Sequence, residues 1–170
     1  FADGFDGGAS LVDRHPNVIM TRTFSKAYGL GGLRIGWGYA AREVIDVLNR
    51  IRQPFNLSNA QMEAARAAVL DRDFTDRCIA LNARMRDRMR QSLIQMGIGC
   101  DESFANFVLA RFDSPQTATA ADAALRAEGI LVRRVGGYGL PDALRITVGD
   151  EAAVTRVLDC LGNFMQGRAQ

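Results

Sequence analysis

The sequence is poor in the residues that metal centres and histidine-based catalysis need. It has one histidine, His15, and three cysteines that lie far apart, Cys78, Cys100 and Cys160. This set gives little support for a metal site, for zinc in particular, or for a Ser–His or Cys–His catalytic pair. An odd number of scattered cysteines is also atypical of a disulfide framework. We therefore expect free thiols, a reducing compartment and a cytoplasmic protein.

Excess charge and long apolar runs are also missing. The formal net charge of the 170 residues is only +2, and 48% of the residues are hydrophobic. So small a charge gives no argument for a nucleic-acid or membrane partner. No apolar run approaches the length of a membrane span, and Phe1 does not begin a signal-peptide pattern. The length predicts a globular protein with one good core or two modest ones.

Residues 21–37 are the part of the chain that indicates chemistry. Lys26 follows a strand-like run and the hydroxyls of Thr23 and Ser25, and it precedes a glycine-rich turn and Arg34. A lysine beside hydroxyls, free amides and an arginine can hold a phosphate and present an amine to an aldehyde. A solvated surface lysine is the plain alternative. A nucleotide P-loop is a weaker one, because here the lysine precedes the glycines.

Residues 129–149 carry two arginines on either side of a glycine-rich loop. Arg133 ends the run Ile-Leu-Val-Arg, and Arg145 lies inside the apolar run Leu-Arg-Ile. An arginine on a rigid strand presents a planar fork to a carboxylate or phosphate, although an internal salt bridge is the alternative for Arg145. Because side chains alternate along a strand, we expect Arg134 on the other face from Arg133. Tyr138 either lines the site or is a surface residue.

Both segments resemble fold-type-I pyridoxal-phosphate aminotransferases, and most closely the histidinol-phosphate aminotransferase family. The resemblance covers nearly the whole chain. It depends mainly on Arg-Thr-Phe-Ser-Lys at residues 22–26 and Gly-Tyr-Gly-Leu-Pro-Asp-Ala-Leu-Arg at residues 137–145. It implies the cofactor pyridoxal 5'-phosphate and transamination of histidinol phosphate with 2-oxoglutarate, giving imidazole-acetol phosphate and glutamate in histidine biosynthesis. An aromatic aminotransferase and a threonine-phosphate decarboxylase of the same fold are the alternatives.

The resemblance also implies roles for individual residues. Lys26 would bind the cofactor and move the proton at the substrate α-carbon. Three residues would fix the cofactor phosphate: Thr23, Ser25 and Arg34. Arg145 would bind the substrate α-carboxylate, and Arg133 would help to hold the substrate phosphate.

The implied fold class is α/β, with a remnant of the large cofactor-binding domain over residues 1–72 and a small carboxy-terminal α+β domain over residues 73–170. In the family, the segment at Phe1 follows a strand that ends in Asp-Glu-Ala-Tyr, whose aspartate pairs with the pyridine nitrogen of the cofactor. This strand is not in the sequence. We therefore expect the carboxy-terminal part of a longer homodimeric enzyme, and a chain that is an inactive fragment when isolated is a further alternative.

Hydrophobic periodicity, caps and breakers predict the elements along the chain. Helices are expected over residues 9–14, 25–30, 44–51, 58–70, 73–96, 117–128 and 151–164. Strands are expected over residues 18–22, 35–40, 104–112, 130–135 and 143–148, the first of them buried. From residue 104 onward, the order strand, helix, strand, strand, helix predicts helices that cover one face of a sheet.

Overall fold

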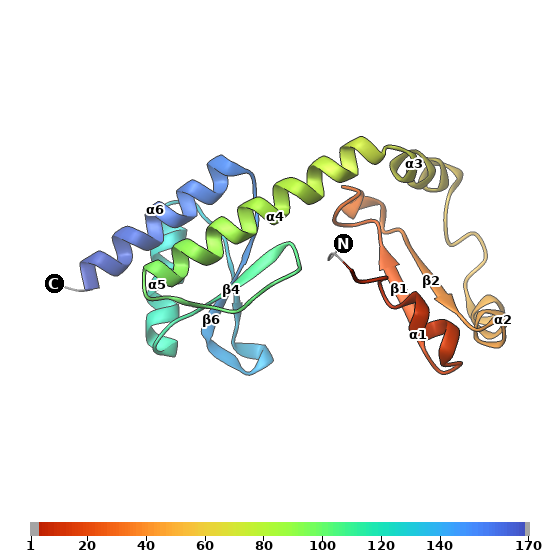
Figure 1. Ribbon diagram of the computed structural model, residues 1–170, viewed down its shortest axis with the longest axis horizontal. Helices are drawn as coiled ribbons and strands as arrows, with labels where there is room; N and C mark the ends of the chain where they lie inside the picture. The colour runs from red at the N-terminus through yellow and green to blue at the C-terminus, as the bar shows by residue number, and fades with distance from the viewer. Residues whose placement is uncertain (1–3, 169–170) are drawn as a thin grey trace. The chain divides into compact units, whose positions relative to one another are not determined.

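The computed structural model describes residues 4–168, which form two compact units with the boundary between Ile79 and Ala80 (Figure 1). Both units contain helices and strands, and the predicted α/β class is confirmed. No helix among residues 4–168 combines the length and the apolar character that a membrane span needs.

The first unit contains a two-stranded antiparallel sheet and three complete helices. Its elements are α1 (Ala9–Arg14), β1 (Ile19–Thr23), the 3-10 helix η1 (Gly31–Leu33), β2 (Gly36–Ala40), α2 (Arg42–Ile51) and α3 (Asn59–Leu70). Thr23 pairs with Gly36 across the sheet. The long helix α4 (Arg72–Gln95) begins in this unit and ends in the second.

A capping box begins α3 at the predicted place. The Ser58 hydroxyl accepts a hydrogen bond from the backbone N–H of Gln61 at 3.3 Å, and the Gln61 side chain accepts one from the backbone N–H of Ser58 at 2.7 Å. Two N–H groups that lack helical partners are satisfied in this way. The cap is Ser58, the residue at which the predicted helix over residues 58–70 begins.

Two predictions for the first unit are wrong. Residues 25–30 form bends and turns instead of a helix, because the N–H of Gly29 donates to the carbonyl of Lys26 at 2.8 Å and Gly29 has a φ of +71°. That left-handed conformation ends the turn before a second helical turn can form. Strand β1 is mostly exposed instead of buried, since among the described residues only β2 joins it in a sheet.

The second unit contains a four-stranded antiparallel sheet in the order β3-β4-β6-β5. The strands are β3 (Gly99–Cys100), β4 (Phe107–Arg111), β5 (Arg133–Val135) and β6 (Leu140–Thr147). The other elements are α5 (Pro115–Ala127), the 3-10 helix η2 (Gly136–Tyr138) and α6 (Glu151–Arg168). The short strand β3 was not predicted, because two residues show no periodicity.

Helices cover one face of this sheet, as the sequence predicts. Alternate strand residues lie in one core with α4, α5 and α6, among them Val108 and Ala110 of β4 and Leu144 and Ile146 of β6. The residues between them point to the other side, because side chains alternate along a strand. We call this side the open face; it carries Phe107, Leu109, Arg111, Arg133 and Arg145.

Candidate functional site

The turn that carries Lys26 is anchored by its buried neighbour Phe24. The N–H of Phe24 donates to the carbonyl of Ile35 at 3.1 Å, and its carbonyl accepts from the N–H of Leu30 at 3.0 Å. Phe24 and Ile35 are both buried, whereas Lys26 is exposed. The backbone of the turn is therefore held in place while the amine remains accessible.

The hydroxyls of Thr23 and Ser25 lie together at the end of β1. The oxygen of Thr23 accepts the backbone N–H of Ser25 at 3.0 Å, and the Thr23 hydroxyl donates to Ser25 Oγ at 2.9 Å. Because Ser25 Oγ acts as the acceptor in this pair, its own proton is left for another acceptor. Thr23 and Ser25 therefore lie together, and the Ser25 hydroxyl can still donate a hydrogen bond to a ligand.

Arg34 closes the loop after Lys26 in an unusual conformation. Its φ of +54° and ψ of +42° are left-handed, a region that residues other than glycine rarely adopt and that is common at functional sites. Its Nη1 donates to the carbonyl of Gly31 at 2.8 Å. The remaining N–H groups of this exposed guanidinium make no hydrogen bond with the described residues.

The donors on this turn suit a phosphate-bearing aldehyde. Among the described residues, the Lys26 amine takes part in no hydrogen bond or ion pair. A primary amine can condense with an aldehyde, while a hydroxyl, a guanidinium and turn amides can bind a phosphate. This turn therefore has the chemical groups that such a cofactor needs.

A second group of predicted residues meets on the open face of the second unit. Arg133 of β5 lies directly opposite Arg145 of β6, so both side chains project from the same face. The Arg145 guanidinium lies over the ring of Phe107, with 5.1 Å from Cζ to the ring centroid. Its Nε is buried without a hydrogen-bond partner, and no ion pair between described residues includes Arg145. The alternative of an internal salt bridge at Arg145 is thus not found in this part of the chain.

Arg133 has an aromatic partner of its own. It donates from Nη2 to the Tyr138 hydroxyl at 2.9 Å, and its Cζ lies 5.5 Å from the centroid of the same ring. Arg134 instead donates to the hydroxyl of Thr119 in α5 at 2.8 Å. The prediction that the two arginines lie on opposite faces is confirmed. Sequence reasoning missed Phe107, because its contact with Arg145 depends on a strand pairing that has no local signal.

Two of the three thiols are in surroundings that make them poor nucleophiles. Cys78, Cys100 and Cys160 are free, as predicted. Burial raises the pKa of both the Cys100 and the Cys160 thiol above the ordinary value, so both are protonated near neutral pH. No group of histidine, cysteine, aspartate and glutamate residues within residues 4–168 is arranged to bind a metal ion.

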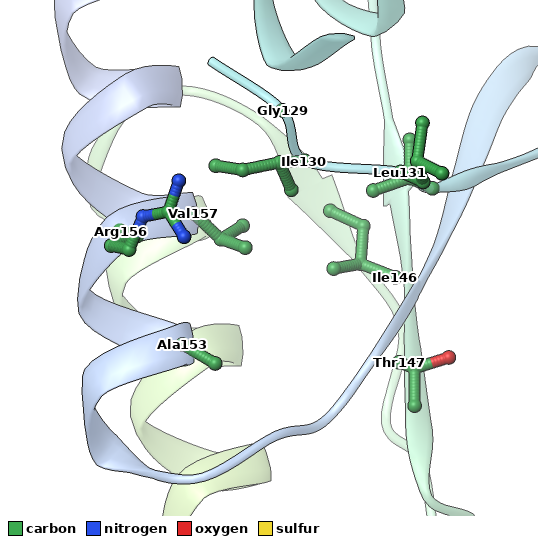
Figure 2. Close-up of a pocket in the computed structure, with 9 residues that line it drawn as sticks. Gly129, Ile130, Leu131, Ile146, Thr147, Ala153, Arg156 and Val157 are labelled. Atoms are coloured by element: carbon green, nitrogen blue, oxygen red, sulfur yellow. The ribbon is translucent and has the colours of Figure 1, made fainter.

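A cavity of 240 Å³ lies between β6, the segment before β5 and α6 (Figure 2). Most of the residues that line it are apolar, including Ile130, Ile146 and Val157. Arg156 is the one charged residue of the lining, and its Nη2 donates to the carbonyl of Glu128 at 2.9 Å. None of the predicted site residues lines this cavity, so it belongs to the packing of α6 on the sheet.

The sequence is similar to known aminotransferases over nearly its whole length. The family model for aminotransferase class I and II matches residues 1–161. The histidinol-phosphate aminotransferase of Roseobacter denitrificans is 63% identical over 164 residues, which are 96% of this chain and 46% of that protein. That of Paracoccus denitrificans is 56% identical over 170 residues, which are 100% of this chain and 46% of that protein. The chain thus spans about half the length of these curated relatives.

The fold has close counterparts among solved structures. The crystal structure of histidinol-phosphate aminotransferase from Sinorhizobium meliloti in complex with pyridoxal-5'-phosphate superposes with a TM-score of 0.82 and 30% identity. The match covers 90% of this chain and 42% of that one.

Proposed function

The chain belongs to the aminotransferase class I and II family, and on that premise we propose that it supplies the cofactor lysine and the substrate arginines of a histidinol-phosphate aminotransferase. The observation that carries the proposal is the turn at residues 23–34, where an accessible amine follows a hydroxyl pair and precedes a left-handed arginine. The histidinol-phosphate aminotransferase of Roseobacter denitrificans, 63% identical over 164 residues, supports the choice of substrate.

Pyridoxal 5'-phosphate is the cofactor that fits this turn. When bound, it supplies an electron sink for the negative charge that develops at the substrate α-carbon. Lys26 would hold it through the aldehyde carbon, and Thr23, Ser25 and Arg34 would bind its phosphate. The Lys26 amine, once free, would be the base that takes the proton from the substrate α-carbon and the acid that delivers it to the cofactor carbon.

The two arginines of the open face would bind the acidic groups of the substrates. Glutamate presents a single α-carboxylate, which suits the planar fork of Arg145. Histidinol phosphate carries a phosphate ester on the carbon that replaces the carboxylate, and a dianion suits two arginines that lie opposite each other. The reaction would convert histidinol phosphate and 2-oxoglutarate into imidazole-acetol phosphate and glutamate, a step of histidine biosynthesis.

The remaining assignments belong to the same proposal. Residues 1–72 would form part of a large cofactor domain and residues 73–170 a small carboxy-terminal domain. The active enzyme would be a cytoplasmic homodimer with small-molecule substrates and no nucleic-acid or membrane partner. Three free thiols are consistent with a reducing compartment. Because the chain spans about half the length of its relatives, the activity is proposed for the complete enzyme.

Lys26 offers a direct test, since it is the only lysine in the sequence. Incubation with pyridoxal 5'-phosphate followed by borohydride should leave a stable cofactor adduct on the peptide that contains Lys26, detected by mass spectrometry. Lys26→Arg keeps the positive charge but should lose the adduct. In the complete enzyme, Lys26→Ala should abolish transamination and leave the circular dichroism spectrum unchanged. An active Lys26→Ala variant would contradict the assignment.

The substrate is tested separately from the cofactor. Turnover of histidinol phosphate, phenylalanine and threonine phosphate by the complete enzyme distinguishes the proposed activity from an aromatic aminotransferase and from a threonine-phosphate decarboxylase. We expect the highest kcat/KM with histidinol phosphate.

A further inference from the structure

The guanidinium of Arg133 donates a hydrogen bond to Tyr138, a tyrosine that follows it by five residues. Tyr138 ends the 3-10 helix η2, and Gly139 follows with a φ of +80°. The N–H of Gly139 donates to the carbonyl of Gly136 at 3.0 Å, which closes a tight turn. This turn brings the phenol oxygen of Tyr138 to 2.9 Å from Nη2 of Arg133.

Other arginines of the same sheet are satisfied by the fold itself. Arg111, also on the open face, forms an ion pair with Asp101 at 2.8 Å, and Arg134 on the opposite face donates to the Thr119 hydroxyl. Arg133 and Arg145, in contrast, have no carboxylate partner among residues 4–168. Both are stacked on aromatic rings instead.

This arrangement is unfavourable unless an anion binds. Like charges directly opposite on neighbouring strands repel each other, and Arg133 is paired in register with Arg145. A buried donor without a partner, such as Nε of Arg145, is uncommon and calls for a ligand or water. Tyr138 is 66% exposed, so its ring contributes little to the core, and its observed contacts are with Arg133.

We propose that Tyr138 is a positioning residue, which holds Arg133 so that Arg133 and Arg145 bind one phosphate group together. The phenol oxygen takes one N–H of Arg133 and restrains its long side chain, while the other N–H groups stay free for the ligand. Restraint before binding lowers the entropy that is lost when the ligand binds. Tyr138 would thereby set the preference for phosphorylated over phosphate-free substrates. The substrate part of this inference rests on the proposed function.

The kinetic test compares Tyr138→Phe with Leu131→Ala in the complete enzyme. Tyr138→Phe keeps the ring and removes only the hydrogen-bond acceptor, whereas Leu131 is 78% exposed and belongs to no part of the proposed site. Tyr138→Phe should raise KM for histidinol phosphate by about three- to tenfold, the worth of one hydrogen bond, with little change in kcat. Leu131→Ala should change neither constant.

A double-mutant cycle separates positioning from a general structural role. In the Arg133→Ala background, Tyr138→Phe should have no further effect on KM for histidinol phosphate, because its only target is gone. Phosphate-free histidinol should be converted equally well by the native enzyme and Tyr138→Phe. Equal losses with both compounds, or the same loss in the Arg133→Ala background, would overturn the proposal.

A binding experiment keeps the inference distinct from the proposed function. Inorganic phosphate is titrated into the 170-residue chain, and the arginine Nε–H signals are followed by NMR. We expect the signals of Arg133 and Arg145 to shift together, those of Arg134 to stay, and Tyr138→Phe to weaken phosphate binding by about threefold or more. If Tyr138→Phe binds phosphate as tightly as the native chain, Tyr138 does not position Arg133, whatever the enzyme transaminates. If the binding result holds and no transamination is found, only the proposed function fails.

Discussion

At Arg145 a half-buried guanidinium lies over the Phe107 ring while its Nε has no partner among the described residues. An unsatisfied buried donor costs about 1–3 kcal/mol. An apolar residue at this position would leave no buried donor unsatisfied and would remove the repulsion from Arg133. The contact with Phe107 offsets part of this cost. We propose that a bound ligand, by accepting the free N–H groups, compensates for the rest of this cost.

Arg145→Met is therefore expected to separate activity from stability. The half-reaction of the complete enzyme with glutamate should lose about 10- to 150-fold in kcat/KM, as expected for a charge-assisted hydrogen bond. The free energy of unfolding should not fall, because repulsion from Arg133 and the unsatisfied Nε are both removed. Stopped-flow absorbance and urea unfolding measure the two quantities. Arg134→Ala, on the opposite face, is the control. If Arg145→Met instead lowers the free energy of unfolding and leaves the glutamate kinetics unchanged, Arg145 is a structural residue.

Among the elements, α3 depends on a local signal at its N-cap, Ser58. Ser58→Ala removes one half of the capping box, and we expect a loss of about 1 kcal/mol in the free energy of unfolding of the first unit. Ser58→Asn keeps a side chain that caps helices well and should lose much less. Urea unfolding followed by circular dichroism tests both. Equal losses in the two variants would show that Ser58 acts through something other than the cap.

The start of α5 responds to pH through Asp113. A hydrogen bond from the Thr117 hydroxyl holds the pKa of that carboxyl below its ordinary value of 3.8, and Arg168 adds a smaller effect from 3.0 Å. A depressed pKa in the folded state means that the stabilisation is present above 3.8 and is lost as the pH falls through the folded pKa. The contact lies at the protein surface, so the effect is small.

The stability difference between the native chain and Asp113→Asn should accordingly shrink with acid. Thermal unfolding at about pH 6 should show the native chain to be more stable, and at about pH 3 the two should converge. A difference that is the same at both pH values would mean that the charge of Asp113 does not contribute to stability through Thr117 and Arg168.

At the scale of the whole molecule, the two units differ in how much apolar surface they bury. In the first unit, Val12, Phe24 and Ile35 are the buried apolar residues of the described part, and Phe55 is fully exposed. The core of the second unit joins α4, α5, α6 and the sheet, with fully buried side chains such as Met89 and Leu161. Local stability follows buried apolar contact, so the two units should open with different free energies.

Hydrogen exchange on the 170-residue chain should show this difference directly. Amides of β4, β6 and the second half of α4 should exchange most slowly, and those of β1, β2 and α2 fastest among the helices and strands. Addition of pyridoxal 5'-phosphate should slow exchange around residues 23–34 and leave β4 unchanged. Uniform protection in both units would contradict the assignment of separate cores.

The positions of most helices and the residue types around Lys26 are determined by signals that are local in the sequence. The helices predicted over residues 58–70 and 73–96 agree with α3 and α4 to within one residue at each end, because a helix end depends on neighbours three and four residues away. The chemistry proposed for Lys26 has the same local origin, since the hydroxyls, glycines and arginine near it all lie in one short segment. The prediction of a helix over residues 25–30 was wrong because Gly29 adopts a positive φ. Hydrophobic periodicity contains no information about that angle.

Only the tertiary structure decided how distant residues meet. The pairing of Arg133 with Arg145 and the contact of Arg145 with Phe107 depend on strand register, which is set by the packing of Val108, Leu144 and Ile146 against the helices. The contact between Arg133 and Tyr138 of η2 depends on the same register. Because strand side chains alternate, a shift of one residue would turn β6 over and move Arg145 into the core. The residue types of this site are thus local information, but their common face is a property of the folded sheet.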